Sequence, residues 1–209
     1  MFKYATFPSL IFLTVAIQAS AATLVPNADS YVQRSVGNNN FGNATNLLVK
    51  NDTGNFVRKV YTRFDTSGLF GPVESATLNL NFVNSGVGAG GAINWEFEVY
   101  GLNDGVPGEA WVEGSGQTGV GSPTPPNPIS WNNAPANNTT SGNLLTGDAT
   151  SLGTFDIAGQ TANIAFSSPA LIDFLNNDLD DMATIIVVRN TLQPNGQNTY
   201  VHAIASREN

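Results

Sequence analysis

Residues 76–82 read ATLNLNF, a strict alternation of apolar and polar side chains. A period of two predicts a β-strand, with Leu78, Leu80 and Phe82 facing a core and the polar residues between them facing solvent. A strand with one polar face indicates antiparallel pairing, because the strands of a parallel sheet are usually covered on both faces. This stretch therefore predicts an antiparallel sheet with one buried face.

Eight further segments have strand-like patterns and are separated by turns rich in Gly, Asn, Pro, Ser and Thr. They cover residues 30–36, 47–51, 57–66, 95–102, 152–157, 161–166, 183–189 and 200–206. One helix is expected, because Ser168 suits an N-cap, Pro169 suits the first helical position, and Leu171 opens an apolar face. We therefore predict an all-β fold, an antiparallel two-sheet jelly-roll β-sandwich with one short helix.

The tryptophans are interpreted from their surroundings. Trp95 alternates in phase with Phe97 and is expected in the core. Residues 101–147 instead contain few periodic apolar side chains and many Gly, Pro and Asn, which predicts a long excursion on the surface of the sandwich. Trp111 and Trp131 are the large side chains of this excursion, and we expect them to anchor it.

The start of the chain has the organisation of a targeting segment. It contains one cation, Lys3, an apolar run over residues 10–17 and small residues at 19–22. This order is typical of a secretory signal peptide over residues 1–22; a buried strand or a membrane anchor is the alternative. A single domain over residues 23–209 is then expected outside the cell, as a secreted protein. The chain has no cysteine, so this domain must be stable without disulfides.

Positive charge is concentrated near the start of this expected domain. Between residues 23 and 65, five cations face three carboxylates, whereas from residue 66 onward two arginines face thirteen carboxylates. A local basic field on a molecule with a net charge of −8 indicates an anionic partner. The acidic balance argues against nucleic acid as a partner and, once the signal peptide is removed, against a membrane surface.

The strand expected at residues 57–66 carries much of this positive charge. Its alternation places Val60 and Phe64 toward the core and Lys59, Tyr61, Arg63 and Asp65 on the opposite face, which is expected to meet solvent. We predict a ligand-binding site formed by Arg34, Lys50, Arg58, Lys59, Tyr61 and Arg63, with Tyr31 as a further aromatic neighbour. A guanidinium pairs bidentately with a carboxylate, so Arg63 is expected to contribute most; an internal ion pair with Asp65 is the alternative.

Short motifs in several places carry a resemblance to a known family. They are ADSYV at 28–32, LLVK at 47–50, RKVYTRFD at 58–65, SATL at 75–78, WVE at 111–113 and ISWNNAP at 129–135. In this order they resemble the secreted DNRLRE domains, which are classed as carbohydrate-binding module family 96. The resemblance covers nearly all of residues 23–209 and implies a β-sandwich that binds acidic polysaccharide, alginate in the characterised members, without catalysis. Two departures are an insertion at residues 114–128 and the end of the chain at Asn209, where relatives continue into a short final strand.

No cofactor is expected to be required, although a structural calcium ion suits the composition of the loops. Hard cations need only oxygen ligands, and these loops are rich in Asp and Asn. Asp29, which opens the first strand, is the candidate metal ligand, with a turn-capping role as the alternative. His202 is the one histidine of the sequence and lacks the partners that zinc requires, so a structural role is expected.

No nucleophile–base pair or catalytic carboxylate pair stands out, so the protein is not expected to be an enzyme. The leading hypothesis is a secreted, non-catalytic carbohydrate-binding module for anionic, uronate-containing polysaccharide such as alginate. A structural or adhesive extracellular matrix protein is the first alternative, and a polysaccharide lyase or hydrolase is the second. The sequence indicates no oligomeric state.

Overall fold

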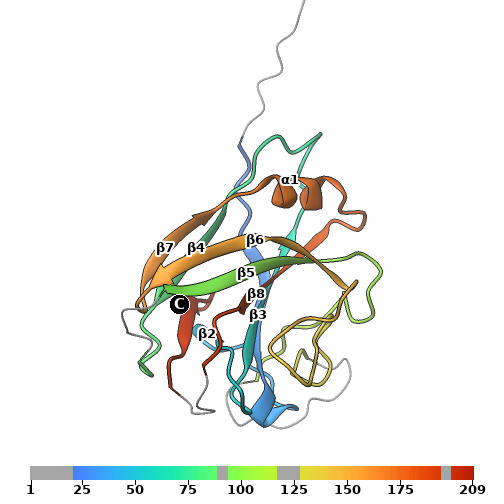
Figure 1. Ribbon diagram of the computed structural model, residues 1–209. Helices are drawn as coiled ribbons and strands as arrows, with labels where there is room; N and C mark the ends of the chain where they lie inside the picture. The colour runs from blue at the N-terminus through green and yellow to red at the C-terminus, as the bar shows by residue number, and fades with distance from the viewer. Residues whose placement is uncertain (1–20, 89–93, 117–127, 194–198) are drawn as a thin grey trace, which may run out of the picture.

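The computed structural model describes residues 21–88, 94–116, 128–193 and 199–209, which form two antiparallel β-sheets packed face to face (Figure 1). One sheet has the strand order β1 (Pro26–Gln33), β3 (Arg58–Asp65), β8 (Met182–Arg189), β5 (Asn94–Leu102), β6 (Ala149–Ala158). The other has the order β2 (Asn46–Val49), β9 (His202–Ala205), β4 (Leu78–Val83), β7 (Ala162–Phe166). The predicted all-β sandwich is confirmed, and each predicted strand segment overlaps a strand of the structure.

The core between the sheets follows the alternation of ATLNLNF. In β4, Leu80 and Phe82 are buried, whereas the intervening Asn81 is exposed. The ring of Phe82 contacts those of Phe97 and Phe155 in the five-stranded sheet, at centroid distances of 5.1 and 5.9 Å. Burial of apolar surface and edge-to-face ring contacts stabilise this packing. The predicted orientation of β4 is therefore confirmed.

The helix α1 (Pro169–Asn176) lies at one end of the sandwich (Figure 1). Ser168 Oγ accepts a hydrogen bond from the Leu171 N–H at 3.0 Å, which caps the helix as predicted. The helix packs closely on the sheet at Gly101, where a Cβ atom would lie 2.4 Å from the ring of Phe174. A glycine at this position of β5 therefore leaves the room that the helix needs.

The first strand ends earlier than predicted. β1 stops at Gln33, and Arg34–Val36 form the short 3-10 helix η1 instead of continuing the strand. The Asn39 N–H donates a hydrogen bond to the Val36 carbonyl at 2.8 Å, which closes a turn directly after η1. The Gly/Asn-rich sequence that follows has no apolar alternation to prolong a strand.

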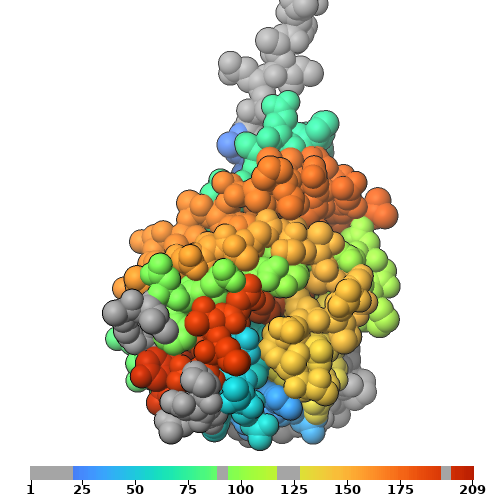
Figure 2. Space-filling model, viewed as in Figure 1, coloured from blue at the N-terminus to red at the C-terminus, as the bar shows by residue number. Residues whose placement is uncertain are grey.

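The excursion between β5 and β6 is described at residues 103–116 and 128–148, which pack on the outer face of the five-stranded sheet. Trp111 and Trp131 are 5% and 2% exposed and belong to one apolar cluster with Tyr61 and Ile186, which lie on that face. Figure 2 shows the gold-coloured part of the excursion lying against the cyan and blue N-terminal segments. The predicted excursion and its tryptophan anchors are confirmed, and they create a second apolar core outside the sandwich.

The predicted signal peptide lies outside the described residues except at its last two positions, so its removal stays a prediction. Within the described ranges, no helix is long and apolar enough to cross a membrane. The helix α1 has eight residues, whereas a membrane-spanning helix needs about 20.

Candidate functional site

Four of the six residues of the predicted cationic site are buried, two of them, Lys59 and Tyr61, against the excursion. Lys50, Lys59 and Tyr61 are 0% exposed, and Arg58 is 4% exposed. The expectation that this face of β3 meets solvent is therefore wrong. Alternation along one strand separates its two faces, but it does not reveal that residues far along the chain cover the second face as well. In this structure these four side chains make contacts inside the protein that stabilise its fold.

Lys59 holds the excursion through its ammonium group. Its Nζ donates hydrogen bonds to Asn137 Oδ1 and to the Asn143 carbonyl, both at 2.6 Å, and to the Asn138 carbonyl at 3.2 Å. The same nitrogen lies 4.7 Å from the centre of the Trp131 ring, within range of a cation–π interaction. Three acceptors and one aromatic face therefore surround this cation, and all four come from the excursion.

This arrangement makes stability depend on pH. Burial, and to a smaller degree the charge of Arg34, lowers the pKa of Lys59 to about 7 from an ordinary value of 10.5. Between these pH values the unfolded chain binds more protons at this position than the folded protein, so the free energy of unfolding is expected to rise with pH. Urea unfolding of wild type and Lys59→Met at several pH values gives the free energy of unfolding of each protein as a function of pH. The difference between the two curves is the contribution of Lys59 to the pH dependence. Parallel profiles from pH 7 to 10 would contradict the lowered pKa.

The remaining buried cations of the predicted site have partners of their own. Lys50 Nζ lies 2.8 Å from Asp52 Oδ2, and both side chains are 0% exposed. Arg58 Nε donates a hydrogen bond to Gln33 Oε1 at 2.8 Å. The first contact is local, within the segment that follows β2, and the second joins β3 to β1; neither cation is left at the surface.

The two tyrosines that the sequence suggested for sugar stacking are also enclosed. The Tyr61 hydroxyl donates a hydrogen bond to the Pro135 carbonyl at 3.1 Å, and burial raises its pKa. Tyr31 is 4% exposed and stacks on Phe41 with ring centroids 4.2 Å apart. Neither ring presents a face to solvent, so the prediction that they stack on a sugar is wrong for this structure.

His202 lies in the core between the sheets. Its Nε2 donates a hydrogen bond to the Gly159 carbonyl at 3.0 Å, and its Nδ1 accepts one from Arg189 Nη1 at 3.2 Å. Burial, assisted by the charge of Arg189, lowers the pKa of His202 to about 4. Arg189 in turn lies 4.5 Å from the centre of the Trp95 ring. The structural role expected for His202 agrees with this enclosed position.

Arg34 and Arg63 are the members of the predicted site that remain partly accessible. Arg63 Nη1 donates to the Trp111 carbonyl at 2.6 Å, Nε donates to Asn27 Oδ1 at 3.1 Å, and the guanidinium lies 5.2 Å from the Trp111 ring centre. Asp65, the alternative partner of Arg63, instead accepts hydrogen bonds within the turn that follows β3. Among the residues that the structure describes, Arg63 Nη2 has no hydrogen-bond partner.

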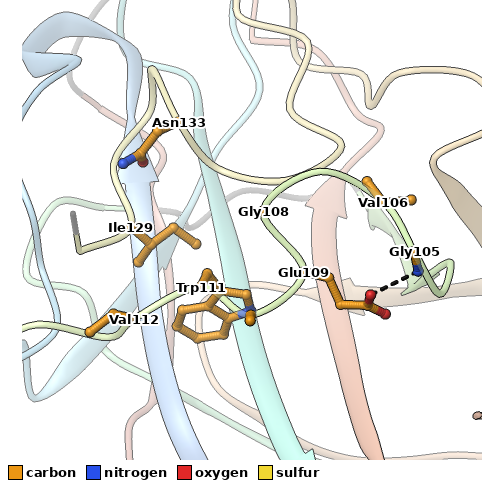
Figure 3. A pocket seen from close by; sticks show the side chains of 9 residues that line it. Gly105, Val106, Gly108, Glu109, Trp111, Val112, Ile129 and Asn133 are labelled. Atoms are coloured by element: carbon orange, nitrogen blue, oxygen red, sulfur yellow. Dashed lines mark hydrogen bonds between the residues drawn. The ribbon is translucent and has the colours of Figure 1, made fainter. Parts of the chain in front are cut away.

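An open cavity of about 510 Å³ lies within the excursion (Figure 3). It is lined by Gly105, Val106, Gly108, Glu109, Ala110, Trp111, Val112, Ile129 and Asn133. In Figure 3 the loop from Gly105 to Val112 curves around the cavity, with Ile129 and Asn133 on its other side. A largely apolar lining with a few polar groups is typical of ligand pockets. The sequence did not predict this cavity, because its walls are irregular segments that only tertiary packing brings together.

Negative charge dominates one side of this cavity. Glu109 Oε2 accepts a hydrogen bond from the Gly105 N–H at 2.8 Å. Burial raises the pKa of Glu109, and the neighbouring charges of Asp180 and Asp104 raise it further. The lining residues include no cation. By its electrostatics, the cavity itself therefore suits a neutral ligand better than an anion.

Asp29, the predicted metal ligand, lies in a group of three carboxylates. One carboxylate oxygen from each of Asp29, Glu113 and Glu208 lies within 4.8 Å of the other two. Sequence patterns do not connect these residues, because they lie on β1, in the excursion and after β9. A carboxylate within the strand-like run ADSYV was the one signal that this position needs a partner.

Residues 20–105 match the family model of carbohydrate-binding module family 96. The match spans β1 to β5 and includes the motifs at 28–32, 47–50, 58–65 and 75–78, so the resemblance seen in the sequence is confirmed for this part of the chain. The two tryptophan motifs lie beyond it. A search of curated proteins found no match. Fold and family match together make this protein similar to carbohydrate-binding modules, a class of non-catalytic binding domains.

Proposed function

We propose that this protein is a secreted, non-catalytic carbohydrate-binding module whose ligand is a uronate-containing polysaccharide such as alginate. The observation that carries the proposal is the match of residues 20–105 to carbohydrate-binding module family 96, on strands of a β-sandwich. The open cavity beside Trp111 supports it, because a sugar ring needs an accessible apolar surface with a few polar groups around it. Export is supported by the signal-peptide organisation of residues 1–22.

A non-catalytic role is supported by the position of the one histidine. His202 is 0% exposed, and a pKa of about 4 keeps it neutral at physiological pH. A general base must reach the proton that it removes, and a side chain enclosed between two sheets does not reach a polymer at the surface.

The preference for uronate depends on Arg63. Its guanidinium is partly exposed, and no described residue forms a hydrogen bond with Nη2, so this edge is available to a sugar carboxylate. A charge-assisted hydrogen bond of this kind is about twice as strong as a neutral one. Arg34 is the second partly exposed cation of the predicted site, whereas Lys50, Arg58 and Lys59 are too deeply buried to contribute.

A neutral glycan is the second candidate ligand, and the charge around the cavity favours it. Glu109 lines the cavity, and the carboxylates of Asp104, Asp178 and Asp180 raise its pKa by adding negative charge nearby. A polyanion that approached this side would meet repulsion. A neutral sugar would instead meet the accessible apolar surface of Val106 and Val112 together with the amide of Asn133.

Affinity electrophoresis in gels that contain polysaccharide separates these candidates. With alginate, we expect retardation that weakens as salt rises from about 50 to about 500 mM, because exposed ion pairs are screened. Arg63→Gln is expected to weaken the binding about tenfold or more, and Arg63→Lys should lose part of it, because lysine keeps the charge without the planar fork. Arg34→Gln removes the second partly exposed positive charge of the predicted site, and a smaller loss than that of Arg63→Gln is expected.

Each possible result of these gels leads to a different conclusion about the ligand. Retardation by hydroxyethylcellulose but not by alginate or pectate would replace uronate by a neutral glycan as the ligand. Equal retardation of wild type and Arg63→Gln in alginate would remove Arg63 from the site. No retardation in any of these polymers would contradict the carbohydrate-binding role, and release of unsaturated uronides from alginate would contradict the non-catalytic one.

A further inference from the structure

A buried carboxylate oxygen without a partner marks a second site. Asp29 is 2% exposed, and within the described residues its Oδ1 accepts no hydrogen bond. The other oxygen, Oδ2, accepts a hydrogen bond from the Arg207 N–H at 2.8 Å. Burial of an uncompensated carboxylate oxygen is costly, and proteins usually supply a donor or a cation to it.

The neighbours of Asp29 increase the negative charge instead of compensating it. A carboxylate oxygen of Asp29 lies within 4.8 Å of carboxylate oxygens of both Glu113 and Glu208. The Asp29 N–H also donates to Glu113 Oε1 at 2.8 Å, which holds the two residues together. Burial, with the charges of Glu208 and Glu113 adding to it, raises the pKa of Asp29 to about 7. Burial is the larger cause of this shift, and the two neighbouring carboxylates add to it.

Arg207 balances only part of the cluster. Its Nε and Nη2 donate to Glu113 Oε1 and Oε2 at 2.9 and 2.5 Å, and Nε lies 3.0 Å from Glu208 Oε1. None of these side-chain contacts reaches Asp29. Three carboxylates against one guanidinium leave a formal charge of −2, which one divalent cation would neutralise.

We propose that Asp29, Glu113 and Glu208 bind one calcium ion. Calcium takes oxygen ligands at about 2.3–2.6 Å, so ligand atoms on one ion lie at most about 5 Å apart, and the carboxylates of this cluster satisfy that limit. The cluster offers no nitrogen or sulfur ligand, which disfavours zinc and softer metals. Magnesium demands a more regular octahedral shell than three side chains on separate segments provide.

Such an ion would connect three parts of the chain that are distant in sequence. Asp29 belongs to β1, Glu113 belongs to the excursion directly after its anchor Trp111, and Glu208 follows β9. Because the ion would bind the folded arrangement and not the separated segments, calcium is expected to stabilise the protein. This site is distinct in its residues from the glycan site proposed above, and the two stand independently.

The full chain, freed of metal with EDTA and studied without polysaccharide, tests the site. Titration calorimetry with CaCl₂ should give one ion per chain, and calcium at about 100 times Kd should raise Tm by about 5 °C or more. Asp29→Asn keeps an acceptor for the Arg207 N–H but removes the buried charge. It is expected to weaken calcium binding about tenfold or more. Its Tm without calcium should equal or exceed that of wild type, the opposite of what loss of a purely structural contact would give.

Two further variants complete the test. Glu208→Gln lies near the surface and should also weaken calcium binding, which keeps the proposal testable if Asp29→Asn fails to fold. Asp104→Asn is the matched control, because it removes one carboxylate from the other acidic cluster, Asp104, Asp178 and Asp180, and should leave calcium binding unchanged. The proposal is overturned if wild type shows no calcium response, if Asp29→Asn and Glu208→Gln both respond like wild type, or if Mg²⁺ acts as strongly as Ca²⁺.

Discussion

Phe82→Ala is expected to lower the free energy of unfolding by about 3–5 kcal/mol, the range found when a buried aromatic ring is removed from a packed core. Phe82 is 2% exposed. Its ring lies 5.1 Å from that of Phe97, 5.9 Å from that of Phe155 and 6.4 Å from that of His202, measured between centroids. These neighbours belong to both sheets, so the cavity left by alanine would be closed only by movement of whole strands.

The neighbouring position on the same strand supplies the control. Asn81 is exposed, and Asn81→Ala is expected to change the free energy of unfolding by less than about 0.5 kcal/mol. Urea unfolding of both variants, with the slope m compared to confirm two-state behaviour, measures the difference. A loss below about 1 kcal/mol for Phe82→Ala would mean that β4 does not line the core.

Lys59→Met is expected to destabilise the protein by about 3 kcal/mol at pH 7, although it removes a buried charge. Methionine keeps the length and the apolar contacts of the side chain but donates no hydrogen bond. The oxygens of Asn137, Asn138 and Asn143 would then lose their shared donor. The Asn137 oxygen would be left buried without a partner, which costs about 1–3 kcal/mol, and the two partly buried carbonyls would add smaller losses. Relief of the desolvation of the ammonium offsets part of this loss.

The loss should be concentrated in the excursion. Hydrogen exchange is expected to accelerate at the amides of Leu145, which donates to the Ala136 carbonyl at 2.8 Å, and Asn137, which donates to the Ala134 carbonyl at 3.3 Å. Arg34→Met is the matched control, because Arg34 is partly exposed and should contribute less than about 1 kcal/mol. Unchanged stability and unchanged exchange in Lys59→Met would show that the excursion is held by its tryptophans alone.

The strands and the helix were predictable because their signals are local. Alternation in ATLNLNF reports which side chains of β4 face the core, and Ser168 with Pro169 marks the start of α1. Where the local pattern ends, the prediction failed: Arg34–Val36 follow an alternating run but form a 3-10 helix. The polar residues and glycines that follow Val36 favour a turn. Hydrophobic periodicity does not show at which residue the strand ends and the turn begins.

The binding site was not predictable from the same signals. A cation beside an aromatic ring occurs both in sites that bind uronate and in buried cation–π contacts that stabilise the fold, so the sequence does not distinguish the two. Lys59 with Trp131 proves to be a buried anchor, since Trp131 and the hydrogen-bond acceptors of Lys59 come from the excursion, whereas Arg63 beside Trp111 stays partly exposed. Only burial separates the two cases, and burial of β3 on its second face depends on contacts more than 70 residues away, such as the Lys59–Asn137 hydrogen bond at a separation of 78 residues.

The position of β8 at the centre of the five-stranded sheet has a consequence for how the chain folds. β3 and β5 are not neighbours; each pairs with β8, which is contributed by Met182–Arg189 near the end of the chain. Without β8, the pairs β1–β3 and β5–β6 would each have an open edge facing the other, and no strand would join them. Residues 20–105, the part matched by the family model, contain β3 and β5 without the strand between them. A sheet whose central strand comes from so late in the sequence has many long-range pairings and is expected to fold slowly, and residues 20–105 alone cannot complete it.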